Sequence, residues 1–128
     1  EEVGGMMSKR TPSDVIEELL HQMGYKGTYM GMASLATAVE LVWQDRTLLH
    51  AVTKVLYPEV ARRCGGTWRT VERNLRTAAK ACWDHGDRAL IQEMAGIELR
   101  AMPSTGELIY YIVAYIRRHG LLDEFEAD

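Results

Sequence analysis

Four basic side chains recur along one predicted helix at a spacing that suits a polyanion. They are Arg69, Arg73, Arg76 and Lys80, separated by four, three and four residues. At about 100° per residue, a helix places all four on one face. Aligned cations can contact successive phosphates, and the release of counterions then supplies much of the affinity. The predicted chemistry is therefore phosphate binding of the kind that a nucleic acid offers.

The opposite face of the same helix is apolar, which gives the helix a side to bury. Its residues are Val71, Leu75, Ala78 and Cys82, with Trp68 at the edge. Thr67 is placed to cap the helix, which is predicted to extend to about residue 84. One face would pack on a core while the other carries the cations into solvent.

Basic charge is concentrated in this part of the chain. Arg62 and Arg63 precede the helix, and the segment from Lys54 to Lys80 holds seven cations against Glu59 and Glu72, a net charge of +5. The whole chain has a formal net charge of −3, so the rest of it is acidic. Such local basicity is typical of a phosphate-binding surface.

Glu72 is an acid among the arginines of the basic face. A carboxylate can accept a hydrogen bond from cytosine N4, while arginine can grip guanine O6 and N7. This mixture of charges favours a helix that reads bases in the major groove. The alternative is an intrahelical ion pair between Glu72 and Arg76, four residues apart.

A helix-turn-helix is predicted over about residues 58–84. Ala61 is small enough for a close helix crossing, Gly65 tolerates left-handed geometry in the turn, and Val71 supplies an apolar anchor on the second helix. The spacing Ala-x3-Gly-x5-Val suits this motif, although ordinary helical hairpins also contain such spacings.

The remaining pattern predicts an all-α domain of about six helices. Thr11-Pro12-Ser13-Asp14 is a helix start with a capping box, and the nearly apolar segment 32–44 predicts a central buried helix. Asp45 is placed to cap a helix that Tyr57-Pro58 interrupts, because the residue before a proline disfavours helical geometry. The expected helices cover residues 12–23, 32–44, 45–56, 58–64, 67–84, 87–94 and 105–118, and residues 97–102 could be extended.

Length and composition fit one folded domain. The chain has 128 residues, of which 47% are hydrophobic and 26% charged. We expect a disordered lead at residues 1–10, left by cloning or ending an upstream linker, a helical domain at 11–122, and an acidic tail at 123–128. Cys64 and Cys82 have no framework spacing, which favours a reduced, cytoplasmic setting. The longest apolar run, residues 108–116, is too short to span a membrane.

Three segments resemble a known family. They are Val52 to Pro58 (VTKVLYP), Val71 to Arg73 (VER), and Trp83 ahead of a turn at Gly86. Together they resemble the C-terminal effector domain of stage 0 sporulation protein A, the response regulator that commits endospore-forming bacteria to sporulation. The resemblance extends from about residue 15 to residue 118.

The resemblance implies a six-helix DNA-binding domain whose recognition helix reads a short promoter box. By matching position, Glu72 and Arg73 would face bases, and Arg76 would face bases or phosphates. Thr70 stands where the family motif carries an arginine, and Arg69 lies one position earlier, so the target box could differ.

The resemblance also implies partners and a setting. Family members can bind in tandem and contact RNA polymerase, for which the sigma subunit is the expected target, in the bacterial cytoplasm at the nucleoid. No receiver domain precedes the segment, which would then be a part of a longer regulator or a free-standing relative.

The predicted contact set extends beyond the three residues placed by the resemblance. In full it comprises Arg62, Arg63, Thr67, Arg69, Thr70, Glu72, Arg73, Arg76 and Lys80.

Other function classes find less support in the sequence. Cys82 and His85 have a Cys-x2-His spacing, but no second pair of metal ligands lies nearby. No nucleophile stands beside a base and no phosphate-binding glycine loop is present, so we expect neither an enzyme nor a cofactor. The surviving alternative is a protein-interaction module that keeps the helix-turn-helix shape and regulates another transcription factor. Surplus apolar residues in 105–118 could also form a dimer contact on DNA.

Overall fold

The computed structural model describes residues 11–122, so the predicted lead at 1–10 and acidic tail at 123–128 lie outside the described residues. Within residues 11–122 every regular element is helical, and no strand occurs there. The α-helices are α2 (Pro12–Gln22), α3 (Tyr29–Gln44), α4 (Tyr57–Cys64), α5 (Trp68–His85), α6 (Arg88–Ala95) and α7 (Thr105–Arg118). Two short segments, the 3₁₀ helix η1 (Arg46–His50) and the π-helix η2 (Val52–Leu56), lead into α4. The predicted all-α class with about six helices is confirmed.

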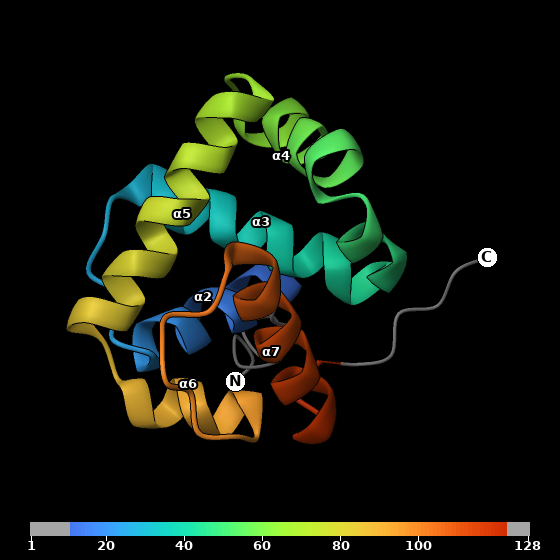
Figure 1. Ribbon diagram of the computed structural model, residues 1–128. Coiled ribbons are helices and arrows are strands. Elements are labelled where there is room, and N and C mark those ends of the chain that lie inside the picture. The colour runs from blue at the N-terminus through green and yellow to red at the C-terminus, as the bar shows by residue number, and fades with distance from the viewer. Residues whose placement is uncertain (1–10, 123–128) are drawn as a thin grey trace, which may run out of the picture.

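Helix α3 passes through the middle of the molecule, as its apolar sequence predicts. It packs against α2, α4, α5 and α7 (Figure 1). Leu35, Ala38, Val39 and Val42 on α3 have no exposed surface. In Figure 1, α4 and α5 meet at one end of the molecule and α6 and α7 lie at the other. Because α3 supports α4 and α5 from behind, their outer faces remain open to solvent.

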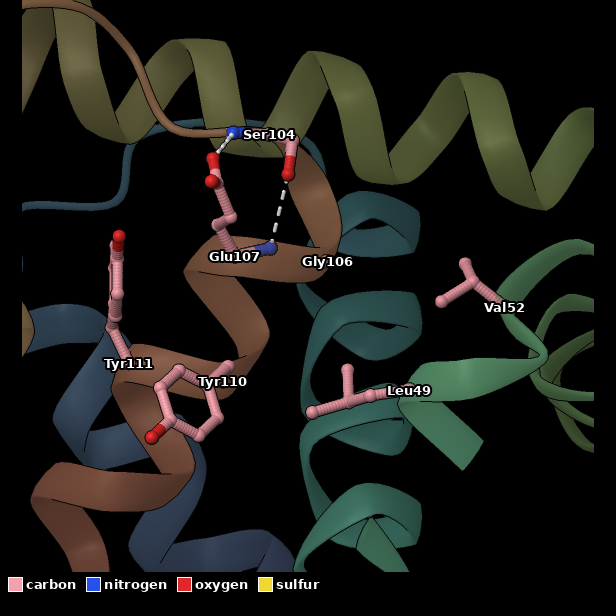
Figure 2. A pocket seen from close by; sticks show the side chains of 7 residues that line it. All are labelled: Leu49, Val52, Ser104, Gly106, Glu107, Tyr110 and Tyr111. Atoms are coloured by element: carbon pink, nitrogen blue, oxygen red, sulfur yellow. Dashed lines mark hydrogen bonds between the residues drawn. The ribbon is translucent and has the colours of Figure 1, made fainter. Parts of the chain in front are cut away.

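The predicted start signals operate as expected. The Thr11 hydroxyl accepts from the backbone N–H of Asp14, and the Asp14 carboxylate accepts from the N–H of Thr11, with Pro12 at the start of α2. Ser104 and Glu107 form the same reciprocal pair at the start of α7 (Figure 2). Each such box satisfies two backbone donors that a helix otherwise leaves open. The bounds predicted for the last helix, 105–118, match α7.

The start of α3 differs from the prediction by three residues. We expected a loop up to residue 31, since Gly27 and Gly31 suggest turns. Instead Thr28 caps the helix by accepting from the N–H of Gly31 (2.9 Å), and Gly31 lies within the first turn. Its lack of a side chain is required by packing, because a Cβ there would lie 2.4 Å from the Tyr25 hydroxyl oxygen.

The segment before Pro58 is not the interrupted α-helix that we predicted. Asp45 does cap it, by accepting from the N–H of Thr47, but the helix is η1, and it ends at Ala51. In η2 the N–H of Tyr57 then donates to the carbonyl of Val52, five residues back. Tyr57 itself has helical angles (φ −63°, ψ −43°), so the predicted break before Pro58 is wrong. The wider π turn relieves the crowding that a proline ring causes against the preceding α-helical carbonyl, and the chain enters α4 without a break.

Residues 97–102, predicted as possibly extended, form an irregular connection between α6 and α7. The N–H of Leu99 donates to the side-chain oxygen of Gln92 at 2.7 Å, which fixes the connection on α6.

The apolar residues of α7 serve the core. Leu108, Ile109, Ile112, Val113 and Ile116 are each at most 1% exposed. Among the described residues, no helix is long and apolar enough to cross a bilayer.

Two backbone turns touch at the glycine that ends α5. A Cβ on Gly86 would lie 2.3 Å from the carbonyl oxygen of Met23 and 2.5 Å from that of Cys82, and both obstacles are backbone. We expect Gly86→Ala to lower the free energy of unfolding by about 1–3 kcal/mol, the usual range for overpacking. Urea denaturation followed by circular dichroism measures this change.

Gly106→Ala is the matched control for that substitution. The nearest atom to a Cβ at Gly106 is a methyl carbon of Val52 at 3.9 Å, which is ordinary contact. Because alanine favours a helix over glycine by about 0.5–1 kcal/mol, this variant should be slightly more stable than the wild type. Equal loss of stability in both variants would contradict the close approach at Gly86.

Candidate nucleic-acid interface

Helices α4 and α5 are joined by a turn that contains two glycines. The turn starts at Gly65, whose N–H donates to the carbonyl of Ala61 at 2.7 Å. Gly65 has φ 94° and ψ 166°, so φ is positive as predicted but ψ is extended rather than left-handed helical. The next residue, Gly66, also has positive φ (86°). A Cβ on Gly66 would lie 2.5 Å from the Thr70 hydroxyl, so the second glycine, which the sequence analysis did not single out, is also required.

The predicted helix-turn-helix is present. Val60 on α4 and Val71 on α5 are both buried, and Ala61 is half-buried at the contact between the helices. The packing of α4 and α5 on each other and on α3 fixes the direction in which α5 presents its outer face.

Helix α5 has the two faces that its sequence predicts. Val71, Leu75, Ala78 and Cys82 are each at most 1% exposed, and Trp68 at the edge is half-buried. The cations of the opposite face are all exposed: Arg69, Arg73, Arg76 and Lys80. Helix α5 therefore holds its basic face outward through the burial of the other side.

Some of the basic residues already have acidic partners. Glu59 pairs with both Arg62 and Arg63, and the Arg62 guanidinium lowers the pKa of the Glu59 carboxyl. Lys80 pairs with Asp84 one turn further along α5 and lowers the pKa of that carboxyl. These pairs are exposed, and such pairs contribute little to stability, so a phosphate can replace the carboxylate at small cost.

The central arginines are different. Within residues 11–122 no acidic group lies within ion-pair distance of Arg69, Arg73 or Arg76. The guanidinium of Arg69 lies 5.0 Å from the centre of the Trp68 ring, which orients it along the start of α5. Arg73 and Arg76 extend from the middle of the exposed face.

Glu72 lies half-buried beside these arginines. The ion pair with Arg76 that the sequence analysis weighed is not formed among the described side chains. The carboxylate is therefore not neutralised within the helix, and it can accept a hydrogen bond from outside.

Thr67 and Thr70 have structural tasks at the start of α5. The N–H of Thr67 donates to the Thr70 hydroxyl (3.0 Å), which in turn donates to the carbonyl of Thr67 (2.9 Å). The Thr67 hydroxyl accepts from the N–H of Thr70 at 3.3 Å. Their predicted contact with DNA must then involve the positive end of the helix rather than free side-chain donors.

The other candidate sites lie away from this face. Burial raises the pKa of the Cys82 thiol to about 11, while His85 is exposed, so the two do not converge on one point. Residues 11–122 hold no cluster of three or more His, Cys, Asp or Glu that could bind a metal. A pocket of about 640 Å³ lies between the η1–η2 segment and α7 (Figure 2). Its lining residues are Leu49, Val52, Ser104, Gly106, Glu107, Tyr110 and Tyr111, none of which belongs to the predicted contact set.

The arrangement of α4 and α5 agrees with the match to a protein family. Residues 16–116 match the family described as sporulation initiation factor Spo0A C terminal, which covers more than half of the chain. The chain belongs to this family. The Spo0A C-terminal family consists of DNA-binding domains that act in sporulation and transcription regulation, and it is not a family of enzymes. The fold, the helix-turn-helix and the family thus point to the same general activity, DNA binding.

Proposed function

We propose that this Spo0A C-terminal domain binds duplex DNA sequence-specifically by placing α5 in the major groove. The observation that supports the proposal most directly is the exposed face of α5. There Arg73 and Arg76 carry charges without acidic partners among the described residues, and Glu72 stands between them, also unpaired. A major groove about 12 Å wide admits a helix, and it offers donors and acceptors for both kinds of side chain.

The contacts divide into two kinds in this proposal. Glu72 and Arg73 face base edges, with Arg76 at bases or the adjacent phosphate. The cations at the rim, Arg62, Arg63, Arg69 and Lys80, contact phosphates, and Thr67 and Thr70 bring the start of α5 to the backbone. Phosphate contacts position a protein on DNA, whereas base contacts supply the specificity.

A salt series tests the phosphate contacts. Arg62→Ala should weaken binding to specific and random duplexes by the same factor, because a phosphate contact carries no sequence information. It should also make the slope of log K against log salt less steep by about 0.9, the effect of one phosphate contact. Fluorescence anisotropy of labelled duplex at several salt concentrations measures both quantities.

Arg46→Ala is the control for that series. Arg46 is an exposed arginine on η1, outside the basic segment, so its removal should leave the slope unchanged. If the wild-type domain binds no duplex even at low salt, the DNA proposal fails and the protein-interaction module remains.

We extend the proposal to the setting and the partners that the resemblance implies. The domain would act at the bacterial nucleoid, in the cytoplasm, with a second copy on tandem sites and with the sigma subunit of RNA polymerase. Because the apolar residues of α7 are buried, a dimer contact through α7 would have to use Tyr110, which is 48% exposed. Sedimentation that shows a monomer at all concentrations, with and without DNA, would exclude the second copy.

A further inference from the structure

A buried tyrosine lies beneath the exposed face of α5. Tyr57 is the first residue of α4 and only 5% exposed. Its phenol hydroxyl forms a hydrogen bond with the side chain of Thr105, the first residue of α7. Glu72 and Arg76 of α5 lie close enough for their charges to act on the same hydroxyl. The starts of two helices and the middle of a third therefore meet at one phenol oxygen.

The phenol at this junction is held in its neutral form. Burial raises the pKa of Tyr57, and the Glu72 carboxylate raises it further, while the bond to Thr105 and the charge of Arg76 act in the opposite direction. At neutral pH the hydroxyl is therefore a fixed dipole with a proton, not a charge. A dipole inside a protein acts more strongly on nearby charges than it would in water.

Neither of the neighbouring charges is fixed by an ion pair of its own. Glu72 is half-buried and Arg76 is exposed, and no ion pair between 11 and 122 includes either. Their orientation depends on the surface from which they extend. That surface includes the Tyr57 hydroxyl, which Thr105 holds in place.

We infer that Tyr57, held by Thr105, is a positioning residue that orients Glu72 and Arg76 for base reading. The inference rests on the proposed function and deepens it, because it adds a buried determinant of sequence preference that touches no DNA. Sites that recognise a ligand precisely depend on such a supporting layer to hold the contacting side chains within a narrow range of positions. The position of Thr105 also ties the reading helix to the start of α7, far away in the sequence.

The test is the base preference of the Tyr57→Phe variant. A selection from random duplexes with the wild-type domain first defines the preferred box, and Glu72→Gln then identifies the base pair that depends on Glu72. At that base pair, Tyr57→Phe should reduce the ratio of preferred to mismatched affinity roughly 3- to 10-fold, the range expected for the loss of one hydrogen bond. Affinity for random duplex should not change, since no phosphate contact is removed.

Thr105 provides a second pair of variants that keep the test decisive if Tyr57→Phe folds poorly. Thr105→Val removes the hydroxyl while it keeps the shape, so it should relax the same base preference. Thr105→Ser keeps the hydroxyl and should retain the wild-type ratio. Tyr57→Phe and Thr105→Val combined should have no larger effect than either alone, because both remove the same bond.

Tyr25→Phe is the matched control. Tyr25 is also buried (8% exposed), and its hydroxyl donates to the carbonyl of Thr28 at 2.7 Å. It lies towards the other end of α5, within reach of Cys82. This variant deletes the same atom from the same residue type, so it should lower the melting temperature to a similar degree and leave the base preference unchanged.

The outcomes separate the inference from the function on which it rests. An unchanged preference in Tyr57→Phe and Thr105→Val, with the wild type still selective, overturns the positioning role alone. Equal relaxation in Tyr57→Phe and Tyr25→Phe also overturns it, because the effect is then one of general stability. A wild-type domain that binds all duplexes alike overturns the proposed sequence-specific function instead.

Discussion

Arg73→Ala is expected to weaken binding to the preferred box by about 1–3 kcal/mol, a factor of roughly 5 to 150. Arg73 is exposed near the middle of the reading face and has no acidic partner among the described residues, so its guanidinium is free for a bidentate contact with guanine. The loss should be much smaller on random duplex, because only the specific complex uses this contact. Competition binding of the two duplexes at one fixed salt concentration measures the ratio.

Arg63→Ala is the control for this prediction. Arg63 pairs with Glu59 and lies on α4, at the rim of the interface, where a phosphate contact is expected. Its loss should reduce the affinity for both duplexes alike. Equal losses on specific and random duplex for Arg73→Ala would refute the base-reading role and leave Arg73 as one more phosphate contact.

The helix-turn-helix could be predicted from the sequence because its signals are local. Thr67 caps α5 within three residues of its partner, and the buried stripe of α5 follows from a period of 3.6 residues alone. Both features depend on the order of the residues and not on distant parts of the chain. The outer face of α5 is then fixed by elimination, since the stripe can point only towards the core.

The path from Asp45 to Pro58 could not be predicted in the same way. The residues there favour a helix, and the proline predicts where it should stop. What occurs instead is a change of helix type at Ala51, which depends on how η1 and η2 pack on α3 and α4. Tertiary packing outweighs a local preference of this size.

The ion pairs of the basic segment show another limit of sequence spacing. Glu59 with Arg63 and Glu72 with Arg76 both have the favourable spacing of four residues, yet only the first pair forms. Glu72 is half-buried next to Tyr57, and this neighbour comes from a different helix. The third participant, Thr105, is still further away in the sequence, so no pattern within α5 could have indicated it.

Leu75→Ala is expected to have the largest effect on stability, a loss of about 2–5 kcal/mol in the free energy of unfolding. Leu75 has no exposed surface, and it holds the middle of α5 against the core directly behind the reading face. Small domains are stable by only about 5–15 kcal/mol, so this single loss removes a large part of the total. Urea denaturation measures it, and the slope of the transition shows whether unfolding stays two-state.

Thr77→Ala, an exposed change on the same helix, should alter stability by less than about 0.5 kcal/mol. The core and the reading face should also separate in the binding data. Below its lower melting temperature, Leu75→Ala should keep the base preference of the wild type, because α5 retains every exposed side chain. Arg73→Ala should keep the stability and lose the preference. If Leu75→Ala instead relaxed the preference while fully folded, the buried side of α5 would take part in recognition more broadly than through Tyr57.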